Sequence, residues 1–203
     1  MSRIIAGSRR GRRITMPPGD RIRPTTDRVR EALFSAMAAW AGTAAELAER
    51  SLAGLSFADL YAGSGAVGLE AASRGAGPVL LVERDPSTAQ LAKGNAQALG
   101  LSVEIATAAV EPMLRRPPVQ PFDVVFADPP YELDTSIVSS QLEQLVTSRW
   151  VGPGSLIVVE RSRRSPDLMW PAAAAKRWNR VYGETILSFG SLEPESGGRA
   201  EEG

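Results

Sequence analysis

The chain has 203 residues, carries 23 basic and 23 acidic side chains, and contains neither cysteine nor histidine. The length suits one domain with a short extension. The composition excludes disulfides, thiol nucleophiles, zinc sites built from cysteine or histidine, and histidine acid–base catalysis, and we predict no metal site. Because no run is apolar enough to span a membrane and nothing marks export, we expect a soluble, cytoplasmic protein.

The first 30 residues are strongly basic, with nine arginines against Asp20 and Asp27. Arginine pairs with phosphate in a bidentate geometry, so this segment indicates a polyanionic partner; a solvated basic arm is the alternative. Isoleucines alternate with the arginines, which favours an ordered β-hairpin. We predict strands over residues 3–5 and 12–16, joined by a turn from Gly7 to Gly11.

A helix is expected to begin near residue 25, where Thr25 or Thr26 can cap its free N–H groups. Asp27 suits the positive end of the helix dipole. The same threonines, with Arg28 and Arg30 nearby, are compatible with binding an anion or a cofactor carboxylate, although capping is the simpler interpretation. The apolar residues of this helix fall on one face and are expected to pack on the protein body: Val29, Leu33, Phe34, Met37 and Trp40. Residues 41–54 are expected to form a surface connection.

Beyond residue 54 the pattern alternates between strands and helices. We predict strands over residues 55–61, 79–83, 103–106, 124–127 and 155–160, and helices over 67–74, 86–99, 110–114 and 135–147. This alternation is typical of a parallel, doubly wound α/β sheet. Segments 178–182 and 184–189 are separated by Gly183 alone, so they should form an antiparallel hairpin that completes seven strands. The chain is thus divided into a basic hairpin extension (1–24), an α/β domain (25–190) and a disordered tail (191–203).

A glycine-rich loop follows the first strand of this domain. Gly63-Ser-Gly-Ala-Val-Gly68 matches the dinucleotide-binding fingerprint, and Glu83 follows about 20 residues later at the end of the next strand. An NAD-dependent oxidoreductase is therefore one alternative, and a glycine turn needed only for helix–strand packing is another. Asp59 opposes the NAD interpretation, because a carboxylate beside the pyrophosphate position repels phosphate and suits a cationic ligand such as S-adenosylmethionine. Glu83 suits the ribose of either ligand.

The strand over residues 124–127 ends in Asp128-Pro-Pro-Tyr131. The two prolines force the chain off the sheet in a stiff turn whose carbonyls lack strand partners. Asp128 adds a carboxylate and Tyr131 a flat aromatic face. Together these groups suit a flat heterocycle that bears an exocyclic amine. The alternative is a proline-terminated strand with a solvated Asp128 and a packed Tyr131.

Asp59-Leu-Tyr-Ala-Gly-Ser-Gly65, Glu83 and Asp128-Pro-Pro-Tyr131 together resemble S-adenosylmethionine-dependent amino-methyltransferases. Two N-terminal stretches make the resemblance more specific: Arg3-Ile-Ile-Ala-Gly7 and Arg23-Pro-Thr-Thr-Asp-Arg-Val-Arg-Glu31. From Arg3 to Phe189 the chain is similar to the RsmD family of bacterial 16S rRNA (guanine-N2)-methyltransferases. The resemblance implies a Rossmann-like class I methyltransferase fold and a monomer. It also implies methylation of the N2 amino group of one guanine in 16S rRNA, within the small (30S) ribosomal subunit or its assembly intermediate.

Site residues follow from the motifs and from this resemblance. Asp128 and the Pro129 carbonyl are expected to accept the two N–H bonds of the target amine, and Tyr131 to stack on the base, with Pro130 stiffening the turn. The residues expected at the cofactor are Thr25, Thr26, Asp59, Tyr61, Ala62, Gly63, Ser64, Gly65, Glu83, Arg84, Thr107, Ala108 and Asp128. The residues expected to contact RNA are Arg3, Arg9, Arg10, Arg12, Arg13, Arg23, Arg163 and Arg164.

Relatives often carry Asp or Asn after the third strand to hold the cofactor adenine, whereas this chain has Thr107-Ala-Ala109, so a backbone group or Thr107 would replace that contact. Arg161, Arg163 and Arg164 follow a strand that we expect to end at Glu160, and they extend the RNA surface or form a solvated loop.

The alternative functions are an adenine-N6 or other amino-methyltransferase acting on RNA or DNA, and a non-catalytic RNA-binding assembly factor that retains a cofactor fold. The Asp128-Pro-Pro-Tyr131 motif suits any exocyclic amine. Only the N-terminal resemblance therefore separates an adenine-N6 or other amino-methyltransferase from the guanine-specific enzyme.

Overall fold

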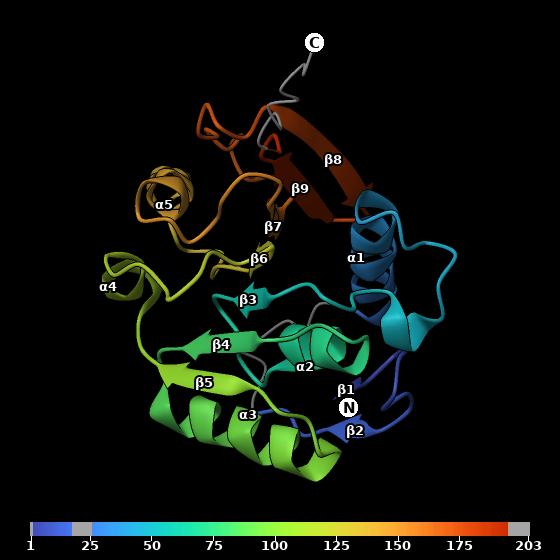
Figure 1. Cartoon of the computed structure of the whole chain (residues 1–203). Helices are drawn as coiled ribbons and strands as arrows, with labels where there is room; N and C mark the ends of the chain where they lie inside the picture. The colour runs from blue at the N-terminus through green and yellow to red at the C-terminus, as the bar shows by residue number, and fades with distance from the viewer. Residues whose placement is uncertain (1, 18–25, 195–203) are drawn as a thin grey trace.

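The computed structural model describes residues 2–17 and 26–194. A seven-stranded sheet forms the centre of the protein (Figure 1), with the strand order β5-β4-β3-β6-β7-β9-β8. Its strands are β3 (Phe57–Asp59), β4 (Val79–Glu83), β5 (Glu104–Thr107), β6 (Val124–Ala127), β7 (Leu156–Ser162), β8 (Lys176–Tyr182) and β9 (Thr185–Ser191). Strands β3 to β7 are parallel, and β9 runs antiparallel to both β7 and β8. The predicted doubly wound sheet with an antiparallel hairpin is confirmed.

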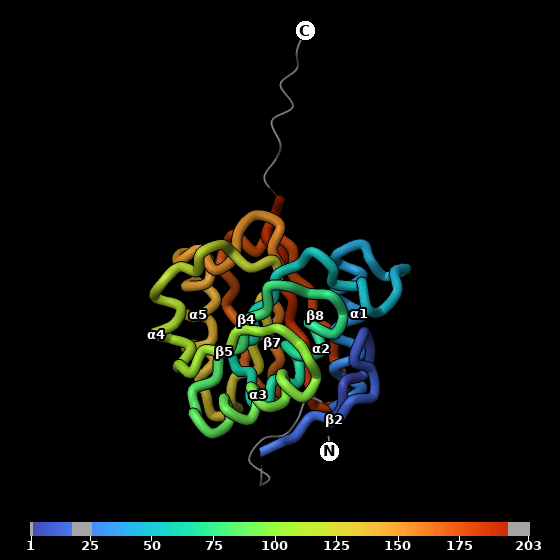
Figure 2. Tube along the Cα trace, turned by 60° about the horizontal axis from the view of Figure 1, so that its bottom comes forward, coloured from blue at the N-terminus to red at the C-terminus, as the bar shows by residue number. Residues whose placement is uncertain are grey.

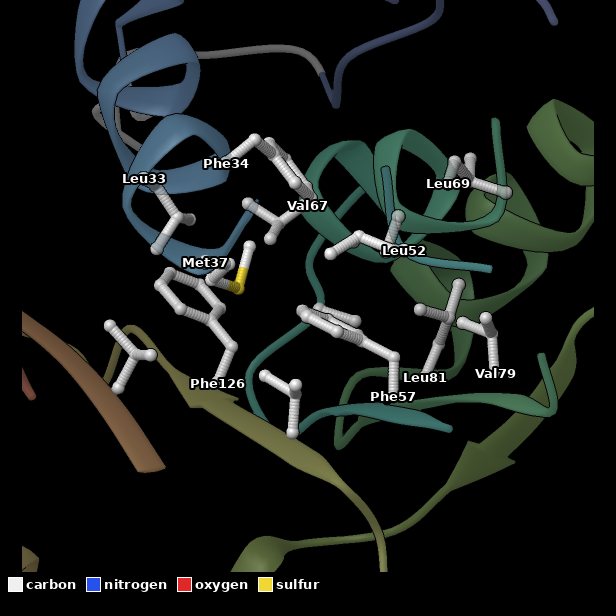
Figure 3. Close-up of a cluster of buried hydrophobic side chains, with 14 of the residues drawn as sticks. Leu33, Phe34, Met37, Leu52, Phe57, Val67, Leu69, Val79, Leu81 and Phe126 are labelled. Atoms are coloured by element: carbon white, nitrogen blue, oxygen red, sulfur yellow. The ribbon is translucent and has the colours of Figure 1, made fainter. Parts of the chain in front are cut away.

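Helices cover both faces of the sheet. They are α1 (Asp27–Trp40), α2 (Ala66–Ser73), α3 (Pro86–Leu99), α4 (Val110–Leu114) and α5 (Thr135–Thr147), and a short 3-10 helix covers Ala48–Arg50. The strands alternate their apolar side chains between two buried clusters, because successive side chains of a strand point to opposite faces. One cluster packs under α1, α2 and α3. Figure 3 shows Met37 of α1 beside Phe126 of β6, and Phe34 of α1 beside Val67 of α2. The other cluster packs under α4 and α5.

The bounds of β4, β6, α3, α4 and α5 agree with those predicted. Helix α3 begins where Asp85 accepts a hydrogen bond from the Thr88 N–H, and it ends at Gly100, whose backbone is left-handed. Strand β3 is shorter than predicted, because the chain turns into the glycine loop after Asp59. Strand β7 is longer than predicted: Arg161 pairs with Ile186 of β9, so the sheet continues past Glu160.

An N-terminal hairpin packs beside α2 and α3 (Figure 2), and its strands are β1 (Ser2–Arg3) and β2 (Arg13–Ile14). The hairpin was predicted, but its paired strands are shorter. The reason is that the backbone N–H groups of Ile5 and Ala6 donate to the carboxylate of Glu70 on α2, at 2.7 and 2.9 Å, instead of pairing across the hairpin.

Glu70 is fully buried and also forms ion pairs with Arg74, at 3.0 Å, and with Arg30, at 3.8 Å. A buried carboxylate with two cations and two backbone donors is well compensated. Arg30 is itself fully buried and donates to the Arg3 carbonyl. The alternative in which Arg30 helps to bind an external anion is not supported, because its charge is used to dock α1 and the hairpin on α2.

In the described part of the chain, no helix is long and apolar enough to cross a membrane. Most of the predicted tail, 195–203, lies outside the described residues, as do Arg23 and Thr25.

Candidate active site

Three carboxylates meet where the parallel strands end. Asp59 is the last residue of β3, and Asp128 directly follows β6. Glu160 lies near the end of β7, next to Val159, which pairs with Ala127 in the sheet. Because the carboxyl ends of β3, β6 and β7 lie at one edge of the sheet, these side chains form a cluster at the place where open α/β sheets bind ligands. We call Asp59, Asp128 and Glu160 the acidic cluster.

The glycine loop lies against the end of β4. The Gly63 N–H donates to Glu83 Oε2 at 3.0 Å, and the Asp85 N–H donates to Glu83 Oε1 at 2.8 Å. Each carboxylate oxygen of Glu83 thus has a fixed position and can still accept another hydrogen bond. A side chain added at Gly63 would meet nothing within 4 Å, so the loop faces open space there. The Glu83 carboxylate therefore has spare acceptor capacity beside the open space at Gly63.

Close packing between helix and strand, the alternative interpretation of the glycine loop, explains Gly68. A Cβ at this position would lie 2.0 Å from a methyl carbon of Leu81, so α2 approaches β4 too closely for a side chain. The packing requirement accounts for Gly68, but it leaves Asp59 and Glu83 to be explained.

Asp59 is buried, with 1% of its surface exposed. Its Oδ2 accepts from the Gly68 N–H at 3.1 Å, and its Oδ1 has no hydrogen-bond partner of normal geometry among the described residues. Burial raises the pKa of Asp59 to about 7, with smaller increases from Glu83 and Glu160, while the N–H groups of Gly68 and Tyr61 partly offset the rise. A buried carboxylate oxygen without a partner is costly.

Burial also raises the pKa of Asp128 well above its usual value, and the negative charges of Glu160 and Asp59 raise it further. The cationic Arg161 acts in the opposite direction. Sequence reasoning did not assign Glu160 to the site. The available signal was its place at the end of the strand next to the one that carries Asp128.

Arg161 was expected on an exposed surface beyond β7, and the structure corrects this. It lies within β7 and is 6% exposed. Its Nη2 donates to the Leu133 carbonyl at 3.0 Å and to Thr135 Oγ1 at 3.3 Å. Arg161 therefore fixes the loop that carries the Asp128-Pro-Pro-Tyr131 motif.

The turn after Asp128 places its aromatic ring at the surface. Pro129 is buried and Pro130 exposed, and the Pro130 carbonyl accepts from the Leu133 N–H at 2.9 Å. Tyr131 is 53% exposed, so part of its side chain is accessible to a ligand. The alternative interpretation, in which the Tyr131 side chain is packed in the interior, does not agree with this exposure.

The other residues expected at the cofactor have varied surroundings. Thr26 caps α1 by accepting from the Val29 N–H. Ser64 is buried and its hydroxyl contacts the sulfur of Met16, while Tyr61 donates to Gln141 at 2.7 Å. Ala62 is buried, Arg84 and Thr107 are exposed, and the Ala108 N–H donates to the Glu83 carbonyl at 3.0 Å.

The hairpin arginines divide into two groups. Arg9 donates to the Leu99 and Gly100 carbonyls, and Arg12 donates to the Ala98 carbonyl, so both satisfy acceptors at the end of α3 and complement its dipole. Arg3 pairs with Asp27 at 3.5 Å. Arg10 and Arg13 are exposed, as are Arg163 and Arg164, and Arg164 pairs with Glu184 at 3.1 Å.

Comparison with known proteins gives consistent results. The family model described as Conserved hypothetical protein 95 matches residues 2–191. A Haemophilus influenzae protein named Ribosomal RNA small subunit methyltransferase D is 35% identical over 168 residues, which cover 81% of this chain and 80% of that protein. The Escherichia coli K12 protein of the same name is 35% identical over 194 residues, or 95% of this chain and 91% of that protein. A solved structure described as a putative methyltransferase, yhhF, from Escherichia coli has a TM-score of 0.79 at 28% identity and covers 95% of this chain and 98% of that chain.

Proposed function

Because the chain belongs to the RsmD family of ribosomal RNA small subunit methyltransferases, we propose that it methylates the N2 amino group of one guanine in 16S rRNA, with S-adenosylmethionine as the methyl donor. Its fold is the Rossmann-like methyltransferase fold. The observation that carries the proposal is the meeting of Asp128 and its proline turn with the buried carboxylate of Asp59 at one sheet edge.

The residues present fit this cofactor. When bound, S-adenosylmethionine supplies an electrophilic methyl group on a positively charged sulfur. Glu83 would accept hydrogen bonds from the ribose hydroxyls, and the loop from Gly63 to Gly65 would lie along the cofactor. Asp59 places a carboxylate at the same sheet edge, which suits the cationic part of the molecule. Thr107 and the backbone of Ala108, beside the end of β4, would lie near the adenine.

Asp128 performs the positioning chemistry. The lone pair of a guanine N2 is delocalised into the ring, which makes the amine a poor nucleophile. Asp128 and the Pro129 carbonyl accept its two N–H bonds and favour a pyramidal nitrogen, while Tyr131 stacks on the base. Positioning and electrostatics then supply most of the rate enhancement. The methyl carbon's bond to sulfur would break as its bond to nitrogen forms, which leaves a neutral thioether, and the nitrogen would then lose one proton to Asp128 or to water.

Access to this site requires the target base to leave its stack, which costs a few kcal/mol for a stacked base and less for one in a loop. We propose a guanine within the small subunit or its assembly intermediate as the target, and a monomeric enzyme in the cytoplasm. Arg10, Arg13, Arg163 and Arg164 are the exposed cations that would contact RNA phosphates. Arg9 and Arg12 contribute less, since their guanidinium groups are bonded to α3.

The test is methyl transfer from labelled S-adenosylmethionine to small subunits purified from a strain that lacks the gene, with naked rRNA and DNA as parallel substrates. Nucleoside mass spectrometry then identifies the product. We expect N2-methylguanosine in subunit RNA. Label on adenine or on DNA would contradict the guanine assignment, and cofactor binding without transfer would favour the assembly-factor alternative.

A further inference from the structure

Asn95 is a polar residue on the buried face of α3, where it is 4% exposed. The other buried residues of this helix are alanines and a leucine. A buried amide costs free energy unless its oxygen and its N–H groups are hydrogen-bonded. The Asn95 amide meets this requirement by bonding to two segments that are distant in the chain, the N-terminal hairpin and the glycine loop.

The hairpin contact is made at Thr15, the residue that directly follows β2. Asn95 Oδ1 accepts from the Thr15 N–H, and Asn95 Nδ2 donates to the Thr15 carbonyl, both at 2.9 Å. The side chain thus pairs with both backbone groups of one residue, as a neighbouring strand would. At the next residue, the sulfur of Met16 lies 3.2 Å from the hydroxyl of Ser64. The end of the hairpin is therefore fastened beside the glycine loop.

The loop contact is made at the peptide group between Ser64 and Gly65. Its carbonyl accepts from Asn95 Nδ2 at 2.9 Å, and its N–H donates to the Ala62 carbonyl at 2.7 Å. The plane of this peptide group is therefore held at both ends. The part of the loop before Ser64 is held by β4, through the carboxylate of Glu83. Asn95 orients the part that leads into α2.

Both N–H groups of the Asn95 amide are used within the protein, so this side chain acts on a ligand only through the loop that it holds. Loss of the bond to the Ser64 carbonyl would free that peptide group to rotate. Such a rotation would displace backbone that is proposed to lie along the cofactor, and small displacements of a binding group reduce its contribution.

We propose that Asn95 is a positioning residue of the cofactor site, which sets the glycine loop by tying the Ser64 carbonyl to the N-terminal hairpin. The inference rests on the proposed function for the contact between loop and cofactor. The hairpin, which was expected from its arginines to contact RNA, then also supports the cofactor site. Residues far apart in the chain, Thr15 and Ser64, act there as one unit.

Binding of S-adenosylmethionine, measured by isothermal titration calorimetry, tests this role. Asn95→Leu keeps the branched shape of the side chain and removes its hydrogen bonds. The matched control is Ser73→Ala. Ser73 is a buried residue of α2 that holds the hairpin at a different place, where its hydroxyl donates to the Ala6 carbonyl and accepts from the Arg9 N–H.

We expect the Kd to rise about tenfold in Asn95→Leu and less than about twofold in Ser73→Ala. A loss of global stability alone does not change the Kd of the folded molecules, so a purely structural role of Asn95 predicts a wild-type Kd. That result would overturn the proposal. An equal rise in both variants would also overturn it, because docking of the hairpin in general would then be responsible.

Circular dichroism and thermal unfolding check that each variant is folded. If Asn95→Leu does not fold, Asn95→Asp takes its place in the titration. It keeps an acceptor for the Thr15 N–H and loses the amide donors. The same rise in Kd is expected, and a wild-type Kd would again contradict the proposal.

Hydrogen–deuterium exchange without cofactor tests the loop directly. The Gly65 N–H is followed, because its bond to the Ala62 carbonyl depends on the peptide group that Asn95 holds. We expect exchange at least about tenfold faster than wild type in Asn95→Leu and unchanged in Ser73→Ala. Wild-type exchange in Asn95→Leu would contradict the inference. Faster exchange with weaker cofactor binding, in a protein that methylates no guanine, would support the role of Asn95 while the proposed function fails.

Discussion

The carboxylate of Glu83 accepts a hydrogen bond from the backbone N–H of Gly63 at 3.0 Å, which ties the end of β4 to the glycine loop after β3. This contact fixes an acceptor beside the open space above Gly63. The contact joins the glycine loop to the end of β4, and the same carboxylate is the one proposed to contact the ribose.

Replacement of Glu83 should weaken cofactor binding more than it harms the fold. Glu83→Ala removes charge-assisted hydrogen bonds worth about 1.5–3 kcal/mol each, so we expect the Kd for S-adenosylmethionine to rise about ten- to a hundredfold. Glu83→Gln keeps the size and one acceptor oxygen, so we expect its Kd to lie between those of wild type and Glu83→Ala. Isothermal titration calorimetry measures the affinities, and a Kd within twofold of wild type for Glu83→Ala would remove Glu83 from the cofactor site.

The raised pKa of Asp59 makes stability depend on pH. Between about pH 4 and pH 7 the folded protein retains the Asp59 proton, whereas the unfolded chain has released it, so the free energy of unfolding falls as pH rises through this window. Asp59→Asn keeps an acceptor for the Gly68 N–H and removes the titration. We expect the variant to gain on the order of 4 kcal/mol relative to wild type between pH 4 and pH 8. Urea denaturation at several pH values measures this difference, and a pH-independent difference would contradict it.

The buried carboxylate of Glu70 should dominate the docking of the N-terminal hairpin. Glu70→Ala leaves Arg30 and Arg74 buried with unpaired charge, and we expect a loss of about 3–5 kcal/mol in the free energy of unfolding. The control is Glu111→Ala, which breaks the exposed pair with Arg115 and should cost no more than ~0.5 kcal/mol. Urea denaturation compares the two variants. Equal losses would show that the hairpin is held by other contacts.

Local signals were sufficient for most elements of the fold. The bounds of α3 follow from Asp85 and Pro86 at its start and Gly100 at its end, and β6 was marked by a short apolar run that ends in two prolines. These signals lie within a few residues of the structure that they specify, so the sequence reveals them directly.

The features that sequence reasoning missed depend on contacts between distant segments. Glu70 is bonded to Ile5, which is 65 residues away in the chain, and no local pattern indicates that pair. The hydrogen bond from Arg9 to the Leu99 carbonyl at the end of α3 was not expected either, because it joins residues that are 90 positions apart in the chain. The burial of Arg161 depends on β9 extending the sheet past Glu160, which only the strand pairing determines.

Single-turnover methyl transfer by Asp128→Ala decides whether Asp128 holds the target amine. Enzyme saturated with labelled S-adenosylmethionine is mixed with small subunits that lack the modification, and N2-methylguanosine is quantified over time. We predict a rate at least about a hundredfold below wild type with the cofactor Kd within about threefold. A near-normal rate, with the fold and cofactor affinity intact, would contradict the account.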